Sequence, residues 1–212
     1  MRYLKILLFA VLLPFCAEAQ EWDDKEYQQI IRQIQLPEIA SRSLSVTVYG
    51  ASPKASAAVN QKAINKAIDI ISSKGGGRVI IPKGTWNTGA IRLKSHVNLV
   101  IEKGATLHFA FEPKLYPLVL TSWEGLACWN YSPCIYARQV TDVAITGQGT
   151  IDGGGNNQTW WQWNGSPRFG YKEGITKESQ KLGSRARLEE MGENDVPVNQ
   201  RRFGMGQGLR PQ

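Results

Sequence analysis

The sequence predicts an all-β fold in which short strands stack as successive coils of a solenoid. Three segments share one unit of strand, glycine with threonine, and strand: "GRVIIPKGTW" (77–86), "VNLVIEKGATLHF" (97–109) and "VAITGQGTIDGGG" (143–155). A unit that forms the same corner repeatedly is typical of stacked coils. No helical period interrupts residues 77–155, which excludes ordinary βαβ crossovers. An antiparallel sandwich is the other architecture that this pattern allows.

Alternating apolar residues and glycine turns place the individual strands of this region. Strands are expected around Val79–Ile81, Ile91–Leu93, Val97–Ile101, Leu107–Phe109, Ile135–Ala137, Val143–Ile145 and Thr150–Asp152. Tight turns are expected at Lys83-Gly84, Lys103-Gly104 and Gln148-Gly149, where glycine supplies the backbone angles of a sharp corner. The alternation predicts Val143, Ile145 and Ile151 inside the stack, with Thr146 and Asp152 outside it or at a corner.

An amphipathic helix is predicted before the first coil and after a strand over Leu44–Ala51. Its apolar stripe consists of Val59, Ala63, Ile64, Ala67, Ile68 and Ile71. The residues expected to face outward are Lys62, Asn65, Lys66 and Asp69. The stripe is rich in alanine, which favours packing on a core over binding at a membrane surface. Because the first coil of a solenoid has an open apolar end, we expect this helix to cap it and to end at Gly75–Gly77.

The chain divides into four segments. Residues 1–19 have a basic start, a short apolar core and small residues before Gln20, as in a cleaved signal peptide, so a secreted or periplasmic protein is expected. Acylation of Cys16 is the alternative. Residues 20–43 are expected to form an N-terminal arm, and 44–157 the capping helix and first coils. Residues 158–212 are predicted to be a polar loop excursion on the cleft side, helical in part over 176–191.

The net charge limits the classes of binding partner, and the cysteines and histidines limit the disulfides and metal sites that the chain can form. The formal charge is +7, and loss of two basic residues and one acidic residue with the leader lowers it to +6. A basic exported protein suits acidic polysaccharide, nucleic acid or anionic membrane, but no basic run interleaved with aromatic residues indicates nucleic acid. Two alternatives are open for Cys128 and Cys134: a disulfide between them, which export permits, or two buried thiols. His96 and His108 lie in strand-like alternation, without the ligand cluster that a metal site requires.

The ordered segments from Leu44 to Gln212 resemble glycoside hydrolase family 28, the polygalacturonases and related pectin-degrading enzymes. The resemblance rests on "VTVYGA", "NQKAINKAID", "GGGRVIIPKGTW", "GAIRLKSHVNLVIEKGATL" and "ITGQGTIDGGG". The stretches "WEGLACWNYSPCIYA" and "RRFGMGQGLRPQ" are similar to the bacterial exo-acting branch. The resemblance implies a right-handed parallel β-helix of the pectin-lyase-like type. It also implies inverting hydrolysis of galacturonide bonds in pectin or galacturonan, with no cofactor. We expect no nucleic acid as a partner, and no membrane after the signal peptide is cleaved.

The family's catalytic motifs are Asn-Thr-Asp, Asp-Asp, Gly-His-Gly and Arg-Ile-Lys, and none stands at a matching position here. The only Asp-Asp, Asp23-Asp24, precedes the fold. The resemblance therefore implies an N-terminal portion with the later coils and the catalytic residues beyond Gln212. We expect this chain alone to be poorly soluble and inactive. A non-catalytic β-helix, such as an adhesin or carbohydrate-binding protein, is the alternative function. A pectate lyase would need calcium-binding carboxylates that are not seen.

Substrate-binding candidates are found outside the catalytic motifs. Trp123 offers a face to a sugar and Glu124 a carboxylate to sugar hydroxyls, although Trp123 also suits a core edge. Arg202 and Arg210, with Arg201, have the paired donors that bind a uronate carboxylate, unless they lie in a solvated loop. The candidate sugar platforms, alternatively loop anchors, are Trp160, Trp161 and Trp163. Asp152 is expected to bond the backbone at a corner rather than to act in catalysis.

Overall fold

A computed structural model describes residues 24–177, 183–205 and 208–211. The chain forms two compact units, Met1–Leu36 and Pro37–Gln212, which we describe separately. The described part of the first unit contains helix α1 (Asp24–Gln33), which lies within the expected arm. The predicted signal peptide, residues 1–19, lies outside the described residues. In the part of the chain that the structure describes, we find no helix with the length and apolarity needed to cross a bilayer.

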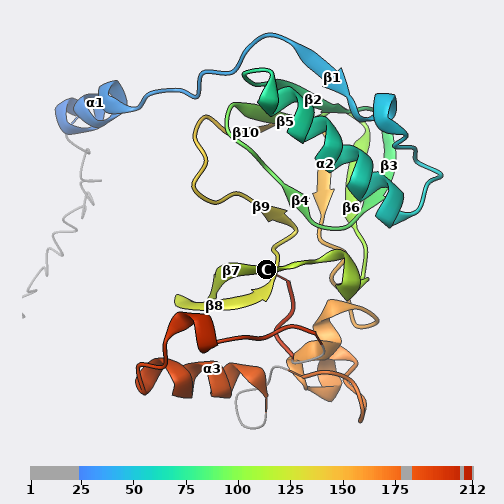
Figure 1. The fold of residues 1–212 in the computed structure, drawn as a ribbon, viewed down its shortest axis with the longest axis vertical. Helices are drawn as coiled ribbons and strands as arrows, with labels where there is room; N and C mark the ends of the chain where they lie inside the picture. The colour runs from blue at the N-terminus through green and yellow to red at the C-terminus, as the bar shows by residue number, and fades with distance from the viewer. Residues whose placement is uncertain (1–23, 178–182, 206–207, 212) are drawn as a thin grey trace, which may run out of the picture. The chain divides into compact units, whose positions relative to one another are not determined.

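The second unit is a stack of coils whose strands form three parallel ladders (Figure 1). The first ladder contains β1 (Ser43–Ser45), β2 (Gly77–Ile81), β5 (Val97–Ile101) and β10 (Ala144–Gly147). The second contains β3 (Gly84–Thr88), β6 (Ala105–Phe109) and β11 (Thr150–Asp152), and the third contains β4 (Ile91–Arg92) and β9 (Ile135–Tyr136). The chain visits the ladders in turn, coil after coil. The architecture is therefore a parallel β-helix and not an antiparallel sandwich.

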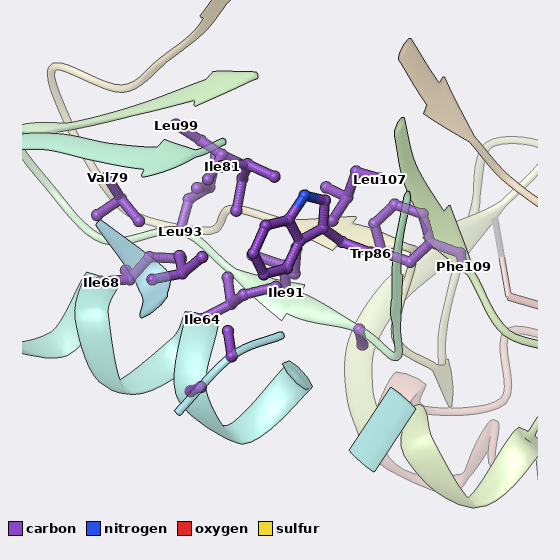
Figure 2. Close-up of a cluster of buried hydrophobic side chains, with 14 of the residues drawn as sticks. Ile64, Ile68, Val79, Ile81, Trp86, Ile91, Leu93, Leu99, Leu107 and Phe109 are labelled. Atoms are coloured by element: carbon purple, nitrogen blue, oxygen red, sulfur yellow. The ribbon is translucent and has the colours of Figure 1, made fainter. Parts of the chain in front are cut away.

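The core lies inside the coils, where side chains in register stack from one strand to the next. Val79 is paired with Leu99 along the first ladder, and Trp86 with Leu107 along the second. All four are at most 2% exposed, and Figure 2 shows them converging on one interior. Burial of each such side chain stabilises the fold by roughly 1.5–3 kcal/mol.

Ile145 and Ile151 were predicted to point into the stack, and the register confirms this direction, but both side chains are half exposed. Ile145 is stacked in register on Leu99 and Ile151 on Leu107, yet they are 43% and 45% exposed. The reason is that β10 and β11 are the last strands of their ladders, and no further strand in the described chain covers them. Val143 is partly buried, as expected for an inward residue at this edge.

Helix α2 (Ala57–Ser73) follows the predicted pattern, with one correction. Ser56 caps its first turn by accepting a hydrogen bond from the Val59 amide, and Gly75 and Gly76 follow its end with positive φ angles. A Cβ atom on Gly76 would lie 2.4 Å from His96, so only glycine fits this close approach. Ile64 and Ile68 are fully buried against the first coil (Figure 2).

Val59 was predicted in the buried stripe and is 48% exposed, so that assignment is wrong. The stripe starts instead at Ala57 and Asn60 and continues through Ile64 and Ile68. With 3.6 residues per turn, Val59 lies about 100° away from Asn60 around the helix. The buried Asn60 amide satisfies three backbone groups, the N–H and C=O of Ser52 and the C=O of Asn87.

The strand predicted over Leu44–Ala51 ends early, at Ser45. A 3-10 helix, Val46–Tyr49, replaces its second half. The Ser45 hydroxyl accepts a hydrogen bond from the Thr47 amide, and Gly50 closes the turn with φ 88°. Serine often bonds the local backbone in this way, which competes with strand pairing.

An antiparallel hairpin that was not predicted interrupts the second coil between β6 and β9. Its strands are β7 (Leu118–Trp123) and β8 (Leu126–Tyr131), joined by Glu124 and Gly125. Both loop residues have positive φ angles, 47° and 92°, as a two-residue type I′ turn requires. Helix α3 (Ser184–Glu193) packs on β8 and accounts for part of the helix expected over 176–191.

Candidate functional site

The hairpin and the C-terminal segment enclose a second, smaller apolar core. Its buried residues are Trp123, Cys128, Leu188, Phe203 and Leu209. Residues 201–203 lie along the edge of β8, where Trp129 donates to the Arg201 carbonyl (2.8 Å) and Phe203 donates to the Trp129 carbonyl (2.7 Å). This arrangement brings all four sequence-predicted binding residues, Trp123, Glu124, Arg202 and Arg210, onto one substructure.

Trp123 is at the edge of this core. It is 4% exposed, and the Arg210 guanidinium carbon lies 5.3 Å from its ring centre. Its indole nitrogen has no hydrogen-bond partner among the described residues. A sugar needs an open ring face for stacking, and this ring is covered. The geometry fits the core-edge interpretation of Trp123 and not the sugar platform.

Glu124 lies in the hairpin turn and already has a cationic partner. Its carboxylate is 2.6 Å from Nη2 of Arg185, whose Nε also contacts Glu189 at 3.0 Å. The ion pair joins the turn to α3. About half of the Glu124 side chain is exposed, so the contact is screened by water and contributes little stability. The ion pair orients the turn, and the Glu124 carboxylate is already engaged rather than left open for sugar hydroxyls.

The arginines cover aromatic rings. The Arg202 guanidinium carbon is 5.1 Å from the Trp129 ring centre, and that of Arg187 is 5.6 Å from Phe203. A guanidinium on a ring face keeps its N–H edge directed sideways, where it can bind a carboxylate. Arg202 is exposed, whereas Arg201 donates to the Val196 carbonyl at 2.7 Å. Sequence reasoning missed Arg187, because only the fold places it over Phe203.

Two of the three clustered tryptophans anchor the loop that follows β11. Trp160 and Trp163 are each 5% exposed and meet edge-to-face at 5.4 Å. Phe111 and Tyr116 pack edge-to-face on Trp160 at 4.6 and 5.4 Å. Trp161 differs, because it is 48% exposed with its edge against Phe169. Trp161 is thus the one of the three with an accessible ring.

Asp152 bonds the backbone and a histidine on the neighbouring coil. It accepts a hydrogen bond from the Gly154 amide at 2.9 Å, and its other oxygen is 2.8 Å from His108 Nδ1. The Gly154 bond, followed by the His108 bond, lowers the pKa of this carboxyl below its ordinary value. Both contacts are those of a corner residue. Within the described ranges, no group of three His, Cys, Asp or Glu residues could hold a metal ion.

Cys128 and Cys134 are free thiols in two different apolar clusters, so the structure has the thiol alternative and not the disulfide. Burial raises the pKa of each to about 11. Neither has the lowered pKa of a reactive nucleophile.

A cleft of about 480 Å³ lies between α2, the β4–β9 ladder and strand β7. Arg92 and Lys94 supply its positive charge and Asp69 its negative charge, while Leu118 and Val119 give it an apolar wall. Its volume is within the range of small-molecule sites, about 300–1,000 Å³. Sequence reasoning did not find this cleft.

The fold and sequence of the chain are similar to those of carbohydrate-active proteins. Its structure matches that of a hyperthermoactive exopolygalacturonase from Thermotoga maritima with a TM-score of 0.80 and 37% identity, over 89% of this chain and 41% of that one. No protein-family model matches the sequence. The chain is polygalacturonase-like, which confirms the resemblance to glycoside hydrolase family 28.

Two curated proteins are similar to this chain in sequence. A probable polygalacturonase from Vitis vinifera is 35% identical over 113 residues, which are 49% of this chain and 23% of that protein. An exo-poly-alpha-D-galacturonosidase from Dickeya chrysanthemi is 30% identical over 120 residues, 53% of this chain and 19% of that protein. The chain thus spans about a quarter or less of the length of these curated relatives.

Proposed function

We propose that this chain is part of a pectin-degrading glycoside hydrolase that cleaves galacturonide bonds with inversion. The observation that carries the proposal is the match to the Thermotoga maritima exopolygalacturonase, which combines a TM-score of 0.80 with 37% identity. Fold likeness alone would leave the function open. Both curated relatives are named for the same activity, which supports the substrate class.

In this proposal the described residues form the scaffold of the enzyme and do not catalyse the hydrolysis. Inverting glycosidases need two carboxyl groups roughly 6.5–9.5 Å apart, one to protonate the leaving oxygen and one to activate water. None of the family's catalytic motifs stands at a matching position in this sequence, and the only Asp-Asp, Asp23-Asp24, precedes the fold. We therefore assign no catalytic residue here and propose that the chain by itself is inactive. The catalytic aspartates would belong to coils that follow Gln212 in the natural protein.

In this proposal α2 is the cap of a right-handed β-helix. Its buried face, including Ile64 and Ile68, covers the first coil, and its exposed face carries Lys62 and Lys66. A capping element with a polar outer surface is what a solenoid needs at its end. The rigid coils then hold the loops that contact the polysaccharide.

The proposed partner is pectin, galacturonan or oligosaccharides derived from them. A net charge of +7 favours an acidic polymer. Arg202, exposed and stacked on Trp129, supplies a donor edge for uronate carboxylates. We propose a secreted or periplasmic location, because residues 1–19 have the composition of a signal peptide and the polymer is outside the cell.

Reading the gene downstream of the Gln212 codon tests this proposal. We expect the frame to continue into Asn-Thr-Asp, Asp-Asp, Gly-His-Gly and Arg-Ile-Lys in that order. A frame that continues without these motifs would favour the alternative function, a non-catalytic carbohydrate-binding or adhesin-type β-helix.

A further inference from the structure

The cleft between α2, the β4–β9 ladder and β7 contains an arginine and a tyrosine side by side. Arg92 and Tyr136 are partners in the parallel register of the ladder, so their side chains leave the same face of neighbouring coils. Ile91 is fully buried, which directs Arg92 outward. The Tyr136 hydroxyl donates to the Leu120 carbonyl at 2.9 Å. The tyrosine ring therefore spans from the coils to the hairpin as one wall of the cleft.

The charge pattern leaves Arg92 able to bind an external carboxylate. Asp69, the only acidic residue lining the cleft in the described chain, is 2.6 Å from Lys94. No carboxylate in the described ranges is within salt-bridge distance of Arg92, which is exposed. A guanidinium binds a carboxylate through two parallel N–H bonds, and this geometry selects anions.

The floor of the cleft is rigid because amide side chains of α2 fasten it to the coils. Gln61 donates to the carbonyls of Ala90 (3.0 Å) and Leu115 (2.6 Å). Asn65 donates to Ala90 (3.1 Å) and accepts from the Arg92 amide (2.9 Å). The backbone of Arg92 is thus fixed before any ligand arrives, which reduces the entropy cost of binding.

From these contacts we infer that the cleft binds a galacturonate unit of an oligosaccharide, with Arg92 as the residue that holds its carboxylate. The apolar wall formed by Pro117, Leu118 and Val119 suits the C–H face of a sugar ring. The inference rests on the proposed function for the choice of galacturonate among acidic sugars. It adds a binding site that the sequence-predicted residues on the hairpin do not include.

Binding of trigalacturonate to the intact chain tests the inference by isothermal titration calorimetry and by NMR. We expect Arg92→Gln to weaken the affinity about tenfold, the loss of one charge-assisted interaction. Arg78→Gln is the matched control, because Arg78 is an exposed strand arginine outside the cleft. It should change the affinity by less than about twofold. The amide resonances of Leu118, Val119 and Tyr136 should shift with trigalacturonate and stay unchanged with neutral galactotriose.

Three results would overturn the inference. The first is unchanged affinity in Arg92→Gln. The second is equal binding of trigalacturonate and its methyl ester, which would show that the site does not recognise the carboxylate. The third is no binding of trigalacturonate at all. If the affinity falls with Arg202→Gln and not with Arg92→Gln, acidic sugar binds at the hairpin, so the cleft inference is wrong and the proposed function stands. Hydrolysis by the natural full-length protein decides the proposed function separately.

Discussion

His108 Nδ1 lies 2.8 Å from Asp152 Oδ2 and links β6 in the second coil to β11 in the third. A second pair, His96 and Asp142 at 3.1 Å, makes another link between the same two coils. The third coil is the edge of the stack, where the apolar stacking residues are half exposed. Polar links at its corners therefore supplement an incomplete apolar contact.

Replacing Asp152 by asparagine tests this link. The folded pKa of Asp152 is lowered, so its charge contributes stability above the ordinary value of 3.8, and the contribution is lost as the pH falls through the lowered folded value. We expect Asp152→Asn to cost less than about 1 kcal/mol at pH 7, because the pair is exposed. Urea unfolding at several pH values should show this difference shrinking below pH 3.8. A difference that grows on acidification would contradict the account.

Asn60 should be important for the attachment of α2. Asn60→Ala removes three hydrogen bonds and leaves the buried backbone groups of Ser52 and Asn87 unpaired. We expect a loss of about 2–4 kcal/mol in the free energy of unfolding. Lys62→Ala, on the exposed face of the same helix, is the control and should change stability by less than about 0.5 kcal/mol. Equal urea midpoints for the two variants would show that the hydrogen bonds of the Asn60 side-chain amide are dispensable.

Trp160 and Trp161 are neighbours in the sequence, and the structure buries the first and leaves the second half exposed. Trp160→Ala empties a buried site against Phe111 and Tyr116 and should cost about 3–5 kcal/mol. Trp161→Ala removes a half-exposed ring and should cost less than about 1 kcal/mol. Urea unfolding gives both values, and limited proteolysis should show faster cleavage near the loop in Trp160→Ala alone. Equal losses in both variants would refute the assignment of Trp160 as the anchor.

The two thiols should react slowly in the folded chain. Burial raises the pKa of Cys128 and Cys134 to about 11, so few thiolates exist at pH 8. Alkylation by iodoacetamide, mapped to each cysteine by mass spectrometry, should be at least about tenfold slower in the native chain than in urea. Rapid native alkylation of Cys128 would mean that the second apolar core is open. Recovery of a disulfide-linked Cys128–Cys134 peptide would contradict the free thiols.

The repeated strand and corner units made the coiled architecture predictable, because each unit encodes its own turn and its own buried positions. The hairpin was missed for a local reason. Its turn is Glu124-Gly125, whereas two-residue type I′ turns usually carry asparagine or aspartate before glycine. The early end of β1 was missed because a serine side chain, Ser45, competes for the backbone, and period-two alternation does not show this.

The site was harder to predict than the fold. Arg92 and Tyr136 are distant in sequence, and only the parallel register places them side by side. The insertion that contains the hairpin lies between their strands, so no spacing rule connects them. Trp123 was considered as a sugar platform on its residue type, but its burial depends on Leu188 of α3 and on Phe203 and Leu209, whose packing the sequence does not reveal.

Release of reducing ends from polygalacturonate is the most direct test of the central claim, that this chain is part of a pectin-degrading hydrolase. The protein encoded by the whole natural reading frame should release reducing ends from polygalacturonate, and the 212-residue chain should release none. Absence of release by the whole protein, with its β-helix folded, would contradict the functional assignment. Release by the 212-residue chain alone would contradict our claim that the catalytic residues lie outside it.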